Sequence, residues 1–152
     1  MSRIDRCSRI IEASPEAVYA AMTDPDALID WLPPDGMSGE ILHFDLRPGG
    51  TCRMVLRYAD PAISGKSGAN EDISDLRFLD LVPGSLVSQS IDFVSDDPRF
   101  AGTMVMHWKL LAVPQGTEVT MEAHAVPEGI SQADHLAGMR ASLDNLARFF
   151  AD

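Results

Sequence analysis

The chain has 152 residues, of which 45% are hydrophobic and 23% are charged, proportions typical of a folded globular domain. Its formal net charge of −11 should repel the phosphates of nucleic acids and of anionic membrane surfaces. No apolar run approaches the roughly 20 residues that cross a bilayer, and the first residues lack the apolar core of a secretory signal. We therefore expect a cytoplasmic protein, built as one domain over residues 1–152, that neither binds nucleic acid nor inserts into a membrane.

The first elements are expected to be a strand and two short helices. Residues 3–11 alternate weakly and contain β-branched side chains, which favours a strand. Ser14 followed by proline is typical of a helix start, and the next proline ends that helix after Asp24. A second short helix passes through Leu28 and Trp31 and ends at two prolines.

Residues 38–126 contain short alternating runs separated by turn residues, a pattern typical of an antiparallel meander. The runs are residues 39–46, 51–58, 73–81, 85–93, 103–111 and 117–126. Residues 59–72 form a long polar stretch that is expected to be a loop. In residues 103–111 the even-numbered side chains are apolar and the odd-numbered ones are mostly polar, so one face of the sheet should be buried and the other wet.

Ser131 is a suitable N-cap for a long final helix. The apolar side chains of this helix form one narrow stripe, at spacings typical of a helix: Leu136, Met139, Leu143, Leu146 and Phe150. About 19 residues, at about 1.5 Å each, would span roughly 28 Å and could cross a whole sheet face. We therefore predict an α+β domain, in which a curved antiparallel sheet of about six or seven strands wraps on this helix, with the two short helices after the first strand.

Five segments, in their order along the chain, carry a resemblance to a known family. They read IEASPEAVYAAMTDPDALIDWLPP, HFDLRPGGTCRMVLRY, RFLDLVPGSLV, DDPRFAGTMVMHWKLLAVPQGTEVTM and VPEGISQADHLAGMRASLDNLARFF. Together they resemble the START-like, or SRPBCC, superfamily, and within it the bacterial branch of the family named after the activator of heat-shock-protein-90 ATPase. The resemblance implies a helix-grip fold with a deep, mainly apolar cavity between helix and sheet, where superfamily members bind lipids, sterols, hormones or polyketides. Many members of this branch have no known ligand or reaction, so the fold alone does not assign a function.

The side chains expected to line such a cavity come from the inner faces of the strands and from the helices. They are Trp31, His43, Asp45, Met54, Phe78, Gln89, Phe93, Met104, Met106, Trp108, Met139 and Leu143. The chain contains eight methionines, whose flexible thioethers suit an ordinary core as well as a pocket that accepts varied shapes. Gln89 and Asp72 are polar residues on otherwise apolar runs, and an inward Gln89 would need a ligand, a water molecule or a protein partner.

His43 and Asp45 share one face of their run, whereas Leu42 and Phe44 share the other. If the polar pair faces inward, it can orient the polar end of a ligand or act in acid–base chemistry. If it faces outward, it is an ordinary surface pair. The other three histidines are expected at the surface: His107, His124 and His135.

Other motifs predict neither a cofactor nor a metal. Residues 60–67 read DPAISGKS, but Asp60 stands where a phosphate-binding loop needs glycine, and a strand rather than a helix follows. We interpret this stretch as a polar surface loop. Cys7 and Cys52 form no C-x-x-C motif and are expected to be small buried hydrophobic residues.

Three functions stay open. We favour the binding of a small hydrophobic or amphipathic molecule without a reaction. The alternative is a cyclase, dehydratase or hydrolase acting on a polyketide-like or aromatic substrate, with His43 or Asp45 in acid–base chemistry. The third is a protein-interaction or chaperone-regulating domain, which we disfavour because one fold uses the whole chain. A homodimer through an edge strand or a helix face is compatible with the sequence, which does not decide it.

Overall fold

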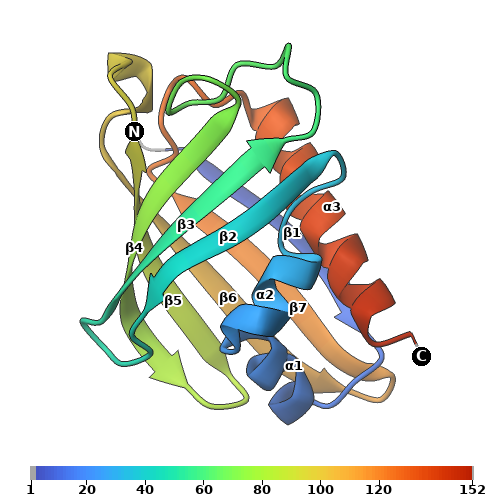
Figure 1. Ribbon diagram of the computed structural model, residues 1–152. Coiled ribbons are helices and arrows are strands. Elements are labelled where there is room, and N and C mark those ends of the chain that lie inside the picture. Colours follow the sequence, from blue (N-terminus) through green and yellow to red (C-terminus); the bar gives the residue numbers. More distant parts are fainter. Residues whose placement is uncertain (1–2, 152) are drawn as a thin grey trace.

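The computed structural model describes residues 3–151 and consists of a curved sheet and three α-helices (Figure 1). The strands are β1 (Ile4–Ile11), β2 (Met37–Phe44), β3 (Thr51–Tyr58), β4 (Glu71–Val82), β5 (Leu86–Val94), β6 (Thr103–Val113) and β7 (Gly116–His124). The helices are α1 (Pro15–Met22), α2 (Pro25–Trp31) and α3 (Gln132–Phe149), with a 3₁₀ turn, η1 (Pro98–Phe100). Within residues 3–151 no helix combines the length and the apolar character that a membrane-spanning helix needs.

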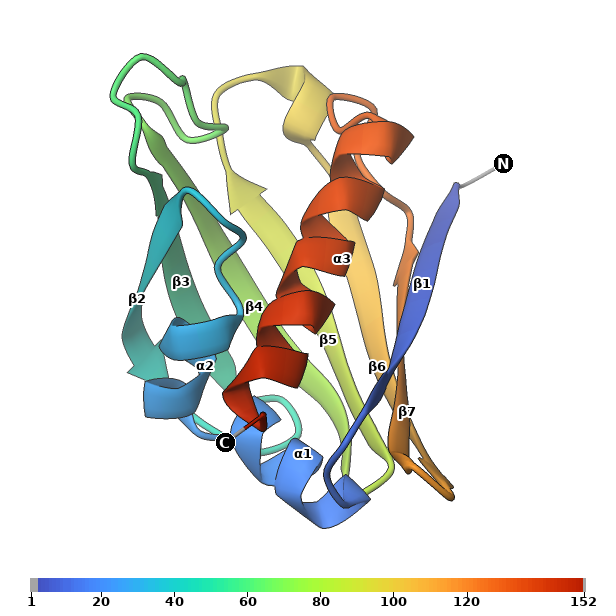
Figure 2. The ribbon, with the colours of Figure 1, turned by 90° about the vertical axis from the view of Figure 1, so that its right-hand side faces the viewer.

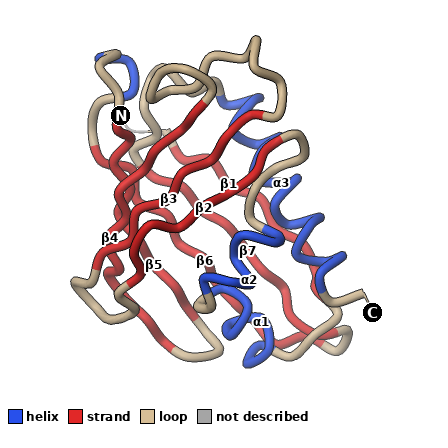
Figure 3. Tube along the Cα trace, viewed as in Figure 1, coloured by secondary structure: helices blue, strands red, loops and turns tan. Residues whose placement is uncertain are grey.

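The sheet has the strand order β1-β7-β6-β5-β4-β3-β2, and every neighbouring pair is antiparallel. Strands β2 to β7 follow one another as a meander, and β1 pairs with β7 at one edge. The sheet curves around α3 (Figure 2), and the three helices gather on its concave side (Figure 3). This is the helix-grip α+β architecture that the sequence predicted.

Three side-chain caps start the helices, and two of them, Ser14 and Ser131, are the caps that the sequence predicts. The Ser14 hydroxyl accepts a hydrogen bond from the backbone N–H of Ala17 at 3.2 Å, and Asp24 caps α2. The Ser131 hydroxyl accepts from the backbone N–H of Asp134 at 3.1 Å. Each cap satisfies one of the free backbone donors at a helix start, so these boundaries are fixed locally.

The buried face of the sheet follows the predicted alternation. On β6 the side chains of Met104, Met106, Trp108 and Leu110 are all buried. The intervening side chains lie on the convex face, where His107 contacts His124. One loop boundary differs from the prediction, because β4 begins at Glu71 and the polar loop therefore covers residues 59–70 rather than 59–72.

Helix α3 is supported along one side of the sheet rather than at its centre. It packs against β1 and against α2. Near its C-terminal half, the Ser142 hydroxyl donates to the backbone oxygen of Leu32 at 2.7 Å, and the Asn145 amide donates to the backbone oxygen of Pro33 at 3.0 Å. These contacts set the distance between α3 and the middle of the sheet.

Substitutions at Gly138 in α3 can test whether the space between α3 and the middle of the sheet is open. A Cβ atom added at Gly138 would meet no atom within 4 Å. Because alanine is more favourable than glycine in a helix interior, Gly138→Ala should raise the free energy of unfolding by about 0.5–1 kcal/mol, measured by urea denaturation. The control is Gly129→Ala, where the added Cβ would lie 2.7 Å from the Phe100 ring and should destabilise the fold. Destabilisation by both substitutions would contradict an open space beside α3.

Candidate ligand-binding site

A cavity of about 760 Å³ lies between the concave face of the sheet and α3. Strands β2 to β7 contribute to its wall, together with all three helices and the loops at one end. Among the largest buried side chains of the wall are Trp31, Phe78, Met104, Met106 and Trp108. Pockets that enclose drug-sized molecules have volumes of roughly 300–1,000 Å³, so this cavity has room for such a molecule.

Three loops lie near the start of α3 at one end of the sheet (Figures 1 and 2), and the cavity wall at this end includes the exposed residues Ser64, Asp96 and Asp134. We call this end the mouth; it is formed by Ser64–Gly68, Ser95–Asp97, Arg99, Gly129–Ser131 and Asp134. The opposite end is covered by α1 and α2 (Figure 2). The polar loop expected at the surface therefore also forms part of a cavity wall, since Lys66 and Ser67 line it.

Most of the residues expected at the cavity lie on its wall. They are Trp31, Met54, Phe78, Gln89, Phe93, Met104, Met106, Trp108 and Met139. All seven methionines that the structure describes line this space. That these side chains contact a ligand stays a prediction.

His43 and Asp45 lie outside the cavity, so the interpretation that places them there is wrong. The strand pairing shifts between Ile41 and His43, which leaves Leu42 as an extra residue in a β-bulge. The bulge ends the simple alternation: Leu42 and His43 are both exposed, and Phe44 turns inward onto the Phe78 ring.

The partners of this polar pair are ordinary surface partners. The His43 Nε2 atom lies 3.0 Å from the Thr51 hydroxyl. Asp45 follows the end of β2, and its carboxylate accepts a hydrogen bond from Arg47 at 2.8 Å. Neither side chain can reach a molecule inside the cavity, which removes both as acid–base groups for such a molecule.

Leu143 is also misplaced by the prediction, because the cavity-facing side of α3 is not its apolar stripe. Leu143 and Leu146 are buried in the core instead. The residues of α3 that line the cavity are Asp134, His135, Gly138, Met139 and Ser142. Large apolar side chains mark where a helix packs on protein, whereas the border of an unfilled space is formed here mostly by small and polar residues.

Two tryptophans meet on the cavity wall. The rings of Trp31 and Trp108 are edge to face, with centroids 5.6 Å apart. The Trp31 indole N–H donates to the backbone oxygen of Ala21 at 3.1 Å. This polar group is satisfied, so the Trp31 ring presents an apolar surface to the cavity.

Asp72 lies at the mouth end of the cavity and is buried, but its charge is compensated. Its carboxylate accepts from the Lys66 ammonium at 3.0 Å, from the Lys66 backbone N–H at 2.6 Å and from the Tyr58 hydroxyl at 3.3 Å. The same ammonium lies 5.5 Å from the centre of the Phe93 ring. The loop of residues 59–70 is thus tied to β4 at the mouth. Within residues 3–151, no group of three or more His, Cys, Asp or Glu side chains is placed to hold a metal ion.

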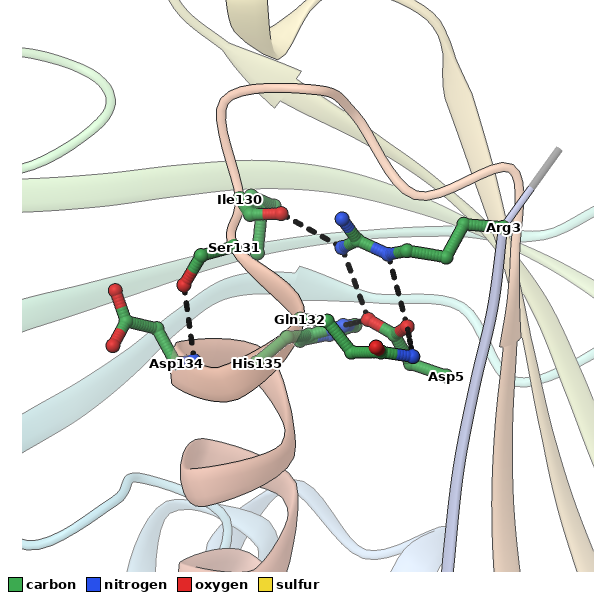
Figure 4. Close-up of polar contacts among 7 residues, drawn as sticks. All are labelled: Arg3, Asp5, Ile130, Ser131, Gln132, Asp134 and His135. Atoms are coloured by element: carbon green, nitrogen blue, oxygen red, sulfur yellow. Dashed lines mark hydrogen bonds and ion pairs between the residues drawn. The ribbon is translucent and has the colours of Figure 1, made fainter.

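His135 was expected at the surface and instead lines the cavity. Its Nδ1 atom lies 2.7 Å from the carboxylate of Asp5, a residue of β1 that is fully buried (Figure 4). Burial lowers the pKa of His135, although the Asp5 carboxylate acts in the opposite direction. The sequence signal for this pair is Asp5 itself, a charged residue on the same face of β1 as the buried Ile11.

Comparison with known proteins assigns the family. Residues 12–151 match the family model described as activator of Hsp90 ATPase homolog 1-like protein. The chain belongs to this family. The resemblance inferred from the five sequence segments is therefore confirmed, together with the START-like fold that it implies.

Solved structures share the fold of this AHSA1-like chain. A crystal structure of a protein from Chromobacterium violaceum has a TM-score of 0.86 and 29% sequence identity, over 98% of this chain and 97% of that one. A protein from Rhodobacter sphaeroides has a TM-score of 0.75 and 23% identity, over 97% and 92% of the two chains. The solution structure of an AHSA1-like protein from Aeromonas hydrophila has a TM-score of 0.73 and 20% identity, over 98% and 91%. No curated protein matches the chain.

Cys52 provides a chemical probe of the cavity wall. Burial, with a contribution from Asp75, raises the pKa of its thiol to about 11. At about pH 8 its thiolate fraction should be about a hundredfold below that of an ordinary cysteine, partly offset by the higher nucleophilicity of such a thiolate. In a Cys7→Ser variant, we expect Cys52 to react with Ellman's reagent at least about tenfold more slowly in the folded protein than in urea. Equal rates in the two conditions would contradict a buried thiol.

The lowered pKa of His135 predicts that the stability of the fold depends on pH. Its pKa is lowered from an ordinary value of 6.5 in the folded state, where Asp5, Arg3 and Lys66 are the charged groups that act on it. Between the two pKa values the unfolded chain binds more protons, so stability rises with pH through this window and falls as the medium is acidified. The free energy of unfolding should decrease from about pH 7.5 to about pH 5.5, and His135→Gln should flatten this slope. His43→Gln, at an exposed position, is the matched control, and a slope unchanged by His135→Gln would contradict the assignment.

Proposed function

We propose that this AHSA1-like domain binds a small hydrophobic or amphipathic molecule in the cavity between the sheet and α3, without a chemical reaction. The observation that carries the proposal is the unfilled space of about 760 Å³ beside Gly138. Protein interiors are normally close-packed, and unfilled apolar space lowers stability because the lining atoms lose contacts. A bound molecule would restore those contacts.

The composition of the wall supports the same proposal. Seven methionines and two tryptophans surround the cavity. Thioether side chains adjust to irregular shapes, and aromatic rings provide large apolar surfaces. Polar groups gather at the mouth, as expected for a molecule with an apolar body and one polar end.

An enzyme acting on such a molecule is the second candidate. The residues first considered for acid–base chemistry, His43 and Asp45, lie on the outside, which weakens this alternative. His135 supports it, because a histidine held by a buried carboxylate borders the cavity. A cytoplasmic location and the absence of a chaperone partner stay predictions, and the sequence leaves a homodimer undecided.

Gly138 allows the cavity to be blocked by design. Gly138→Phe should place a ring in the open space beside α3 and weaken the binding of the neutral fluorescent probe N-phenyl-1-naphthylamine by at least about tenfold. Gly138→Ala is the matched control, and it should bind the probe nearly as well as the wild type. Binding is measured by titration, following energy transfer from Trp31 and Trp108 to the probe. Equal affinity of the phenylalanine variant and the wild type would place the probe elsewhere and contradict the proposal.

The same pair of variants applies to the natural ligand. Protein purified without denaturation is extracted, and small molecules are identified by mass spectrometry. A compound present with the wild type and with Gly138→Ala, but missing from Gly138→Phe, would be assigned to the cavity. A compound carried equally by all three proteins would not be a cavity ligand.

A further inference from the structure

We propose that the Nε2 atom of His135, oriented by Asp5, is a hydrogen-bond acceptor for a hydroxyl group of the bound molecule, so that the cavity selects neutral aromatic or polycyclic alcohols and phenols. This inference rests on the proposed binding function and adds the chemistry of the ligand's polar end. It is carried by the geometry around Asp5 (Figure 4) and by the charges at the mouth.

The Asp5 carboxylate is fixed from three sides. Arg3 donates two hydrogen bonds to it, at 2.9 Å and 3.0 Å, and Gln132 donates one at 3.2 Å. Arg3 also donates to the backbone oxygen of Ile130 at 2.7 Å, which ties β1 to the loop before α3. Hydrogen bonds from His135 and Arg3 hold the pKa of Asp5 below its ordinary value although burial acts to raise it, so the group is a carboxylate.

A carboxylate can only accept, so His135 must carry its proton on Nδ1, the atom that lies 2.7 Å from Asp5. In the neutral ring, Nε2 is then left with its lone pair. Among the described residues Nε2 has no hydrogen-bond partner, and no buried side-chain nitrogen or oxygen atom of the described chain lacks one. Nε2 is therefore not fully buried, and it belongs to a side chain that is 15% exposed and lines the cavity.

The charges at the mouth favour a neutral ligand over an anion. Lys66 and Arg99 supply two positive charges, each paired with a carboxylate, that of Asp72 and that of Asp97. Two further acidic side chains, Asp96 and Asp134, have no ion-pair partner among the described residues. This surplus of negative charge would repel a carboxylate or phosphate group, whereas a hydroxyl group enters without a charge and can donate to Nε2.

The test compares 2-naphthol with 2-methoxynaphthalene, which has the same ring system but no hydroxyl donor. We expect the wild type to bind 2-naphthol roughly five- to tenfold more tightly, the size of one net hydrogen bond, as measured by isothermal titration calorimetry. His135→Phe, which keeps a ring but removes the acceptor, should bring the ratio of the two affinities close to one. The controls are Gln89→Leu, inside the cavity, and His43→Phe, outside it; both should keep the wild-type ratio.

Each outcome of this comparison decides a point. If Gln89→Leu removes the preference and His135→Phe keeps it, the hydroxyl group binds elsewhere and the inference is overturned. If the wild type binds both probes equally and Gly138→Phe blocks both, the proposed function stands and this inference fails. If neither probe binds the wild type, both fail.

A separate measurement tests whether Asp5 orients the His135 ring. Nitrogen-15 NMR of the histidine rings should show the wild-type His135 with its proton on Nδ1. Asp5→Asn can offer a donor to Nδ1, so the proton should move to Nε2 and the preference for 2-naphthol should be lost. Should this variant not fold, the wild-type spectrum alone decides: a proton on Nε2 of the neutral wild-type ring would overturn the inference.

Discussion

The separation between α3 and the sheet is the constraint on which the rest of the structure depends. At its N-terminal end α3 is tied to β1 by the hydrogen bonds of Gln132 and His135 to Asp5. Toward its other end it is tied to the end of α2 through Ser142 and Asn145. Because these polar contacts have strict distances and directions, the helix cannot move toward the middle of the sheet without breaking them. The cavity stays open because α3, which forms one of its walls, is held in place at both ends.

Helix α3 therefore both packs on the protein core and borders the cavity, and two different stripes of its surface serve these two roles. The apolar stripe packs the helix onto protein, most deeply at Leu143 and Leu146. The adjacent stripe, which includes His135, Gly138 and Ser142, borders the open space. Met139 belongs to both. Gly138 has a cost in helix propensity, and the space beside it shows what the missing side chain leaves open.

The fold could be predicted from the sequence because its signals are local. The alternation on β6 and the caps at Ser14 and Ser131 depend only on neighbouring residues. The five matching segments added the family's topology. The bulge at Leu42 could not be predicted in this way, because it depends on pairing with β3, and one extra residue reverses the side on which every following side chain lies. For this reason the site prediction was wrong at His43 and Asp45.

The site prediction failed at His135 for a different reason. Its partner, Asp5, is 130 residues away in the sequence, and only the packing of α3 on β1 brings the two together. A periodicity analysis judges each helix position by its own polarity, so it assigns a histidine at the edge of an apolar stripe to the surface. The more informative residue is Asp5, which the structure places inward, because a buried carboxylate requires partners from elsewhere in the chain.

In this cavity, affinity for a ligand and selectivity between ligands would come from different atoms of the wall. Affinity for a bound molecule would come mainly from apolar contact with the wall, at about 25 cal/mol per Å² of surface removed from water, and many shapes can provide it. Selectivity requires polar atoms that are not already engaged, and the carboxylates of Asp72 and Asp97 are held by their own cations. The Nε2 atom of His135 and the amide of Gln89 have no partner among the described residues and border the cavity. A change at His135, which holds the proposed acceptor, would alter which molecule is bound, and changes of this kind are how one scaffold can serve ligands of different chemistry.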